Sequence, residues 1–198
     1  MIDVLLIGTA PGVGKTRVAG LYAADAIAHG RTPGYLKPAQ TGRVDDARAV
    51  AAAAPGTVCA TVYRFLAAMP PGMASRLEHV APVSIDHVLE AIDELRATTD
   101  GAIVEGGGFL EPLGESTTFA DLAAAAGLPL VIVTRPEIAA LSTVALIAEA
   151  AASRGIEVAG IAINGCANRP SLVERTARAE LAAIAPVLGS LPLEAVAH

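Results

Sequence analysis

A glycine-rich segment near the N-terminus constrains the fold of this chain more than any other feature. Residues 8–16, GTAPGVGKT, follow a short apolar run at residues 2–7 and precede an alanine-rich stretch with helical spacing. A strand, a glycine-rich turn and the start of a helix, in this order, are the context that a phosphate-binding loop requires. Glycines allow a backbone path that side chains would block, so successive amide N–H groups and the helix N-terminus can face an anion.

The end of this segment supplies the groups that a nucleotide needs. Lys15 offers a positive charge to the β- and γ-phosphates, and Thr16 offers a hydroxyl to Mg²⁺. Five residues separate Gly8 from Gly14, one more than the standard phosphate loop has. A plain strand–turn–helix, with glycines that serve only tight packing, is the alternative interpretation. The position of Gly-Lys-Thr at the predicted helix start favours the phosphate loop.

Composition narrows the class of protein. The chain has 198 residues, of which 53% are hydrophobic and 3% aromatic, which predicts one domain over residues 1–198 with a core of Ala, Val, Leu and Ile. A net charge of −6 argues against a broad surface for nucleic acid or acidic membranes. Cys59 and Cys166 lack metal-ligand spacing and are expected to be packed thiols in a reducing cytoplasm. No segment predicts a membrane span or a signal peptide.

Apolar runs and helical periodicity alternate along the chain. Residues 55–83, with two prolines and a glycine at 70–72, are expected to form a loop-rich insertion with a short helix beside a pocket. The alternation predicts an α/β fold, a mostly parallel β-sheet with helices on both faces, as in P-loop NTPases. Strands are expected at residues 2–7, 32–36, 101–105, 128–134, 157–164 and 187–191, and helices from the phosphate loop to residue 28 and at residues 45–54, 85–97, 117–126, 138–154 and 171–184.

Acidic and basic side chains follow two of the predicted strands. Lys37 comes just after the second strand, where open α/β sheets place ligands, although a solvated loop lysine is the other interpretation. Asp45 and Asp46 open the next helix and could be capping carboxylates or metal ligands. Glu105 ends a buried strand and precedes glycines at 106–108. A buried carboxylate is costly unless it is paired or metal-bound, so Glu105 is expected to reach Mg²⁺ rather than turn to solvent.

Together these segments resemble the dethiobiotin synthetase family. The resemblance covers nearly the whole chain, and the long phosphate loop and the stretch KPAQTG are its most specific parts. It rests on GTAPGVGKT at 8–16, KPAQTG at 37–42, EGGG at 105–108 with Pro112-Leu113, and TFAD at 118–121, in this order.

The resemblance implies a reaction of biotin biosynthesis and its participants. Family members are cyclo-ligases that form carbon–nitrogen bonds from MgATP, CO₂ (or bicarbonate as its source) and 7,8-diaminononanoate. CO₂ carbamoylates one amine, and the carbamate attacks the γ-phosphate to give a mixed carbamic–phosphoric anhydride. The second amine then closes the ureido ring and expels phosphate. The resemblance also implies a homodimer with the diamine near its interface.

Roles for single residues are carried over from the same resemblance. Lys15 and Lys37 are the expected catalytic groups, Lys37 acting on the carbamate and on the transferred phosphoryl group, and Thr41 is expected beside the substrate amines. Mg²⁺ is expected at Thr16, Glu105 and Asp46, with Asp45 less favoured than Asp46. Asn164 would meet the adenine edge, and residues 192–194 would border the base. The nucleotide is expected to contact Gly12, Val13, Gly14, Lys15, Thr16, Arg17, Glu105, Gly106, Gly107, Gly108, Asn164, Pro192, Leu193 and Glu194.

Departures from the family pattern leave two alternative functions open. Ala10, Pro11 and Ser142 stand where the family usually has aspartate, a small hydroxyl residue and asparagine, so polar groups near the lysines and the usual substrate contacts are lost. A diverged nucleotide-binding paralogue without synthetase activity is therefore one alternative. A partitioning or regulatory P-loop ATPase is the other. Such proteins usually carry a signature lysine at the position of Ala10, and its absence counts against this alternative.

Overall fold

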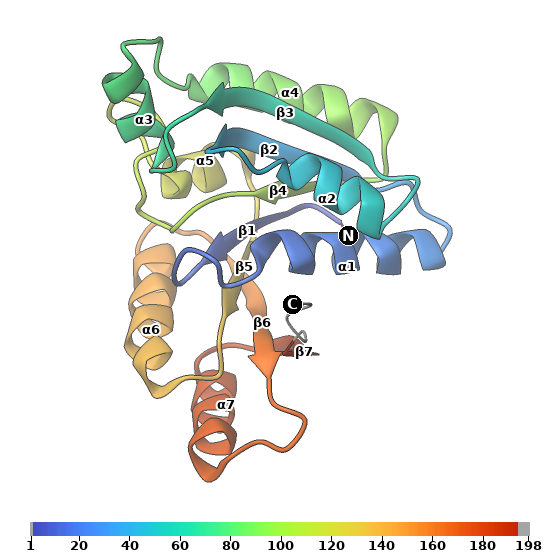
Figure 1. The fold of residues 1–198 in the computed structure, drawn as a ribbon, viewed down its shortest axis with the longest axis vertical. Coiled ribbons are helices and arrows are strands. Elements are labelled where there is room, and N and C mark those ends of the chain that lie inside the picture. The colour runs from blue at the N-terminus through green and yellow to red at the C-terminus, as the bar shows by residue number, and fades with distance from the viewer. Residues whose placement is uncertain (1, 194–198) are drawn as a thin grey trace.

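The computed structural model describes residues 2–193, and these contain a single sheet of seven strands. All strand pairs are parallel, in the order β3-β2-β4-β1-β5-β6-β7, which confirms the predicted α/β class (Figure 1). The strands are β1 Val4–Gly8, β2 Gly34–Thr41, β3 Val58–Phe65, β4 Ala102–Glu105, β5 Leu130–Thr134, β6 Val158–Cys166 and β7 Val187–Pro192.

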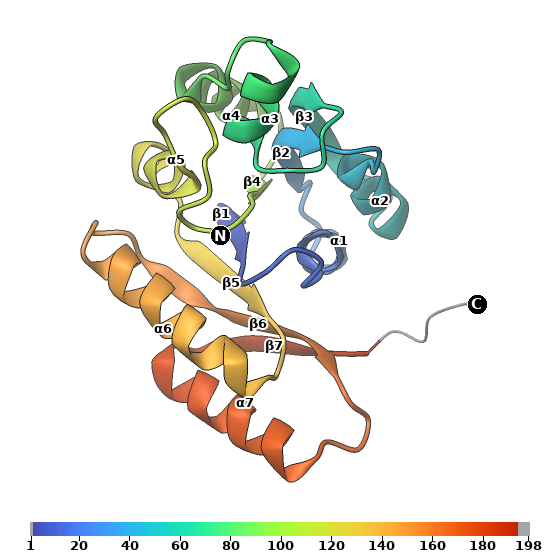
Figure 2. The same ribbon diagram turned by 60° about the vertical axis from the view of Figure 1, so that its left-hand side comes forward.

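Helices cover both faces of the sheet. Figure 2 shows α1 and α2 on one face and α4, α5, α6 and α7 on the other. Within residues 2–193, no helix has both the length and the apolar character needed to cross a membrane. The helices are α1 Lys15–Ala28, α2 Asp46–Ala53, α3 Pro71–Glu78, α4 Ile85–Thr98, α5 Phe119–Ala126, α6 Ile138–Ala152 and α7 Leu172–Ile184.

Each helical layer packs against the sheet through its own hydrophobic cluster, and the central strands contribute side chains to both clusters. Successive side chains of a strand point to opposite sides, so Leu6 and Val131 join the cluster under α1 and α2, whereas Leu5 and Ile132 join the cluster under α4–α7. These side chains are fully buried. Strands that are buried on both faces explain the continuous apolar runs in the sequence.

The N-termini of α4 and α5 lie where the sequence places capping residues. The hydroxyl of Ser84 accepts a hydrogen bond from the backbone N–H of His87 at the start of α4. At the start of α5, Thr118 and Asp121 form a reciprocal capping box. Such caps satisfy backbone donors that the first helical turn leaves without a partner, and they explain why these boundaries were predictable from local sequence.

The prediction for residues 55–83 was wrong in part, because the short helix is present but a strand was not expected. This segment contains α3 and also the eight-residue strand β3, which pairs along the whole length of β2. Most β3 side chains are only partly buried, because β3 is the edge strand of the sheet. An edge strand carries polar residues among its apolar ones, so it lacks the continuous apolar run that marks a central strand.

The second strand extends further than the sequence indicated. β2 runs to Thr41, so Lys37 lies within the strand and not in a loop after it. Its pairing with β4 ends at Leu36, whereas its pairing with β3 continues to Thr41. The residues of β2 beyond Leu36 therefore have only one strand neighbour, and Lys37 lies at the carboxyl edge of the central sheet.

Candidate functional site

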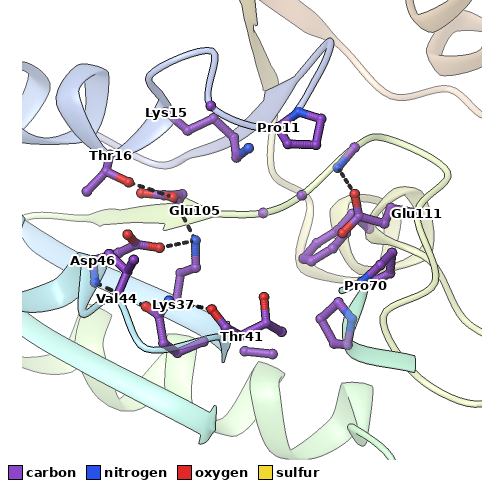
Figure 3. A pocket seen from close by; sticks show the side chains of 18 of the residues that line it. Pro11, Lys15, Thr16, Lys37, Thr41, Val44, Asp46, Pro70, Glu105 and Glu111 are labelled. Carbon is purple, nitrogen blue, oxygen red and sulfur yellow. Dashed lines mark hydrogen bonds and ion pairs between the residues drawn. The ribbon is translucent and has the colours of Figure 1, made fainter. Parts of the chain in front are cut away.

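A cavity of about 690 Å³ lies at the carboxyl ends of β1, β2 and β4. Ligands of open α/β sheets bind at this edge. The phosphate loop forms one wall, the end of β2 and the start of α2 form the second, and the segments after β3 and β4 close the rest (Figure 3). The predicted loop-rich insertion does border this pocket, through residues 68–71.

The phosphate loop has the backbone that its glycines allow. Gly12 and Gly14 have φ angles of 70° and 98°, a region that favours glycine. A Cβ atom on Gly14 would also overlap the side-chain amide of Asn164. The Lys15 ammonium lies 3.1 Å from the place where a Cβ of Gly8 would be. Burial lowers the pKa of Lys15, and the Glu105 carboxylate partly opposes this shift.

The floor of the cavity is a charged cluster formed by Lys37, Asp46 and Glu105. The Lys37 ammonium lies 2.6 Å from Glu105 Oε1 and 2.7 Å from Asp46 Oδ2. Burial by itself would lower the pKa of Lys37, but the two carboxylates outweigh it and raise the pKa above its ordinary value. Lys37 is therefore a charged ammonium that is fixed beside the phosphate loop, although only 8% of its surface is exposed.

Glu105 is oriented from both sides. Thr16 donates its hydroxyl to Glu105 Oε1 at 3.0 Å, and Tyr35 donates its phenol to Glu105 Oε2 at 2.9 Å. Burial, followed by the charge of Glu105, raises the pKa of the fully buried Tyr35, so its hydroxyl stays protonated as a donor. Tyr35 was not predicted from the sequence. The signal was present, because Tyr35 is two residues before Lys37 and therefore points to the same side of β2.

The two neighbouring aspartates at the start of α2 have different contacts. Asp45 is the N-cap of this helix, with Oδ1 accepting from the backbone N–H of Arg48 at 3.1 Å and Oδ2 lying 3.4 Å from Arg64. Asp46 instead turns its carboxylate to Lys37, and its backbone N–H donates to Gln40 Oε1 at 3.1 Å. Asp45 thus acts as a capping carboxylate, while Asp46 belongs to the charged cluster.

Thr16, Asp46 and Glu105 form an oxygen-donor set that fits Mg²⁺. Two carboxylates and a hydroxyl are the hard ligands that this ion prefers, usually together with phosphate oxygens and water. A cation already lies between both carboxylates, since they hold the Lys37 ammonium. Among the described residues, no group of three or more His, Cys, Asp or Glu side chains could hold a metal ion. The arrangement therefore fits a phosphate-bound Mg²⁺ and not an all-protein metal cage.

Arg17, Asn164 and Pro192 form a separate bridge beside the cavity. The guanidinium of Arg17 donates to Asn164 Oδ1 at 2.7 Å and to the carbonyl oxygen of Pro192 at 2.6 Å. The Asn164 amide in turn donates to the carbonyl oxygen of Val13 at 2.8 Å. These bonds link the phosphate loop and α1 to β6 and β7, so the residues expected at the base are brought together with the loop.

The other predicted residues fall into three groups. Thr41 and the glycines at 106–108 line the cavity, as do Ala10 and Pro11. The backbone N–H of Leu193 donates to the carbonyl oxygen of Cys166, so Leu193 extends from the end of β7. Ser142 is exposed on α6, and Glu194 lies outside the described residues.

One further lining residue, Glu111, was not expected from the sequence. It belongs to the segment after β4, and its Oε2 accepts a hydrogen bond from the backbone N–H of Gly108 at 2.9 Å. The stretch around it, FLEPL at 109–113, gives only one hint, a charged residue among apolar ones. Its place in the cavity depends on a turn in which the backbone N–H of Glu111 donates to the carbonyl oxygen of Gly108 at 3.0 Å.

Comparison with known proteins finds relatives that match nearly the whole chain. A family model described as "AAA domain" matches residues 3–197. The chain is 38% identical over 196 residues to the ATP-dependent dethiobiotin synthetase of Streptomyces coelicolor, covering 95% of this chain and 82% of that protein. It is 36% identical over 202 residues to the enzyme of the same name from Mycobacterium avium, covering 100% of this chain and 89% of that protein.

Solved structures agree on the fold. The MinD cell division protein of Aquifex aeolicus superposes with a TM-score of 0.63 at 15% identity, covering 97% of this chain and 83% of that one. The cell division ATPase MinD of Pyrococcus furiosus gives 0.60 at 17% identity, covering 98% and 84%. At this identity the likeness shows the P-loop NTPase fold alone. The sequence matches extend over almost the entire chain at 34% identity or more, and they show that the chain belongs to the family of ATP-dependent dethiobiotin synthetases.

Proposed function

We propose that this protein is an ATP-dependent dethiobiotin synthetase, which joins CO₂ and 7,8-diaminononanoate into the ureido ring of dethiobiotin with release of ADP and phosphate. The observation that supports this most is the Lys37 ammonium, fixed at 2.6–2.7 Å between Glu105 and Asp46 beside a phosphate loop. A reaction that passes through an anionic carbamate and a transferred phosphoryl group needs such a fixed positive charge.

The phosphate loop would bind the triphosphate. The backbone N–H groups of residues 12–16 and the N-terminus of α1 would face the anion, and Lys15 would add a charge at the same place. Thr16, Asp46 and Glu105 would hold Mg²⁺, which when bound neutralises charge on the β- and γ-phosphates. The Lys37 ammonium, held between the same two carboxylates, would face the carbamate and the γ-phosphoryl oxygens from the floor of the cavity.

The diamine would lie on the far side of the cavity from α1, next to Thr41. There the carbamate oxygen can face the γ-phosphate across Lys37, and the second amine can close the ring once the anhydride has formed. The protein contributes position and charge, and no nucleophilic side chain is required. A homodimer and a cytoplasmic location are part of the same proposal.

The direct test is product formation. The purified protein, incubated with diaminononanoate, ¹³C-bicarbonate and MgATP, is expected to produce a ureido product that carries the label and one ADP for each ring formed. Mass spectrometry measures the first and a coupled assay the second. A folded protein that binds MgATP and the diamine but forms no labelled product would contradict the proposal. It would favour the alternative of a diverged nucleotide-binding paralogue.

Tyr35→Phe tests how Glu105 is held. Loss of the phenol hydroxyl leaves Oε2 of a carboxylate that is 2% exposed without its donor. Changes of this kind, in groups that orient a metal ligand, typically cost about 10- to 100-fold in metal affinity or activity. The Mg²⁺ concentration needed for half-maximal turnover is expected to rise. The same titration with Tyr63→Phe is the control, since the Tyr63 hydroxyl lies 3.0 Å from His87 Nδ1, away from the cavity. If this Mg²⁺ concentration rose equally in both variants, Tyr35 would have no specific role in holding Glu105.

A further inference from the structure

The Glu111 carboxylate lies on the side of the cavity that is opposite the charged cluster. In Figure 3 Asp46 and Glu111 occupy opposite walls, with Lys15 and Lys37 between them. The remaining wall near Glu111 carries no charge, because it is formed by residues such as Ala10, Pro11, Pro70 and Pro71. Glu111 therefore gives this end of the cavity a negative charge that none of these neighbours provides.

The position of this carboxylate is fixed by the backbone. Oε2 accepts the hydrogen bond from the N–H of Gly108, and the carboxylate packs against Gly107 so closely that a Cβ there would overlap Oε1. One oxygen is thus used to hold the side chain in place. No hydrogen bond described for residues 2–193 uses the other oxygen, Oε1, which can accept one from a ligand.

Of the three carboxylates that line the cavity within residues 2–193, Glu111 is the one that forms no ion pair with Lys37. Asp46 and Glu105 line the same cavity, but both are in ion pairs with Lys37. None of the ion pairs described for residues 2–193 includes Glu111. Burial lowers the pKa of Lys15 and the charge of Glu111 partly opposes this shift, but the two side chains are at no described ion-pair distance. An anion cradle at one end and a carboxylate outside these ion pairs at the other make the cavity suited to a ligand with separate anionic and cationic groups.

A 1,2-diamine in the middle of its reaction has this distribution of charge. CO₂ adds only to an unprotonated amine and produces an anionic carbamate, while the neighbouring aliphatic amine is mostly an ammonium near neutral pH. A carboxylate that accepts a hydrogen bond from an ammonium forms one of the stronger polar contacts in proteins. We propose that Glu111 binds the ammonium of the diamine that is not carbamoylated, and so determines specificity for a diamine. This inference rests on the proposed function.

The test compares Glu111→Gln with Glu115→Gln. Glutamine keeps an oxygen for the Gly108 N–H, so the segment after β4 retains its hydrogen bond and only the charge is lost. Glu115 is an exposed carboxylate four residues further along, and its variant removes the same charge outside the cavity. Calorimetry measures the binding of diaminononanoate to each protein in the presence of Mg²⁺ and a non-hydrolysable ATP analogue, and the binding of the analogue alone.

Glu111→Gln is expected to weaken diamine binding about 10- to 100-fold, as for the loss of a charged hydrogen bond. Glu115→Gln should bind the diamine like the wild type, and the affinity of both variants for the ATP analogue should not change. Wild-type affinity of Glu111→Gln for the diamine, or an equal loss in Glu115→Gln, would overturn the assignment. So would a wild-type protein that does not bind the diamine. If the wild type binds the diamine, Glu111→Gln does not, and no ureido product forms, the proposed function fails while the assignment of Glu111 stands.

Discussion

Replacing Lys37 by alanine is expected to lower kcat by about 10²- to 10³-fold, the usual effect of removing one preorganised group that stabilises transition-state charge. Nucleotide affinity is expected to change much less, because the phosphates are held by the loop and not by β2. The measurement is kcat from labelled product together with the Kd of the ATP analogue from calorimetry. Lys37→Arg is the matched control for charge. An equal loss of turnover and nucleotide affinity in Lys37→Ala would place Lys37 in ground-state binding instead.

The same substitution has a consequence for stability that follows from burial. Without the ammonium, the buried carboxylate of Glu105 and the partly buried carboxylate of Asp46 face each other with no cation between them. Breaking a buried pair in this way typically costs about 3–5 kcal/mol. The variant should therefore unfold at lower temperature than the wild type, and Mg²⁺ with nucleotide should restore more stability to it than to the wild type. Thermal unfolding with and without MgATP measures both effects.

Replacing Lys15 by alanine is expected to reduce nucleotide affinity by about 10- to 100-fold, since a charged hydrogen bond is worth about 1.5–3 kcal/mol. Turnover should fall at least as far. The fold should be unaffected, because no ion pair described for residues 2–193 includes Lys15, and burial already disfavours its charged form, as its lowered pKa indicates. Removing it leaves no buried carboxylate without a partner.

The control for this prediction is Arg43→Ala, which removes an exposed cation that does not line the cavity. Calorimetry with the ATP analogue gives the affinities, and thermal unfolding without nucleotide gives the stabilities. Wild-type nucleotide affinity in Lys15→Ala would argue that residues 8–16 do not bind phosphate. An equal loss in Arg43→Ala would show that net charge, and not the loop, controls binding.

Local sequence predicted the elements whose signals are local. The phosphate loop was recognisable because a glycine-rich turn of this kind depends on backbone angles, and Gly12 and Gly14 do have positive φ. Glu105 was predicted to be buried because it ends a central strand, and the structure buries it with three partners, Thr16, Tyr35 and Lys37. Its expected contact with Mg²⁺ stays a prediction. The strand β3 was missed because an edge strand is only half buried and does not show a continuous apolar run.

Residue type alone did not show which side chains belong to the site. Asp45 and Asp46 are identical and adjacent, yet one caps α2 and the other contacts Lys37. The difference arises because Asp45 is the N-cap of α2 with an extended backbone, whereas Asp46 is the first helical residue, so the two side chains leave the backbone in different directions. Only the packing of α2 in the fold determines which of them faces the cavity. The same holds for Tyr35. It lies two residues before Lys37 and points to the same side of β2, but this matters only because the fold places Glu105 next to both side chains.

The sequence by itself determined the class of fold, the anion-binding loop and the family, since each depends on residue types within a few positions of one another or on motifs in a fixed order. Tertiary structure alone decided that Lys37 is shared between Asp46 and Glu105, that Tyr35 orients Glu105, and that Glu111 enters the cavity. These contacts join segments up to 70 residues apart, as for Tyr35 and Glu105. Their geometry is set by how β2 and β4 pair in the sheet, and no local pattern encodes that pairing.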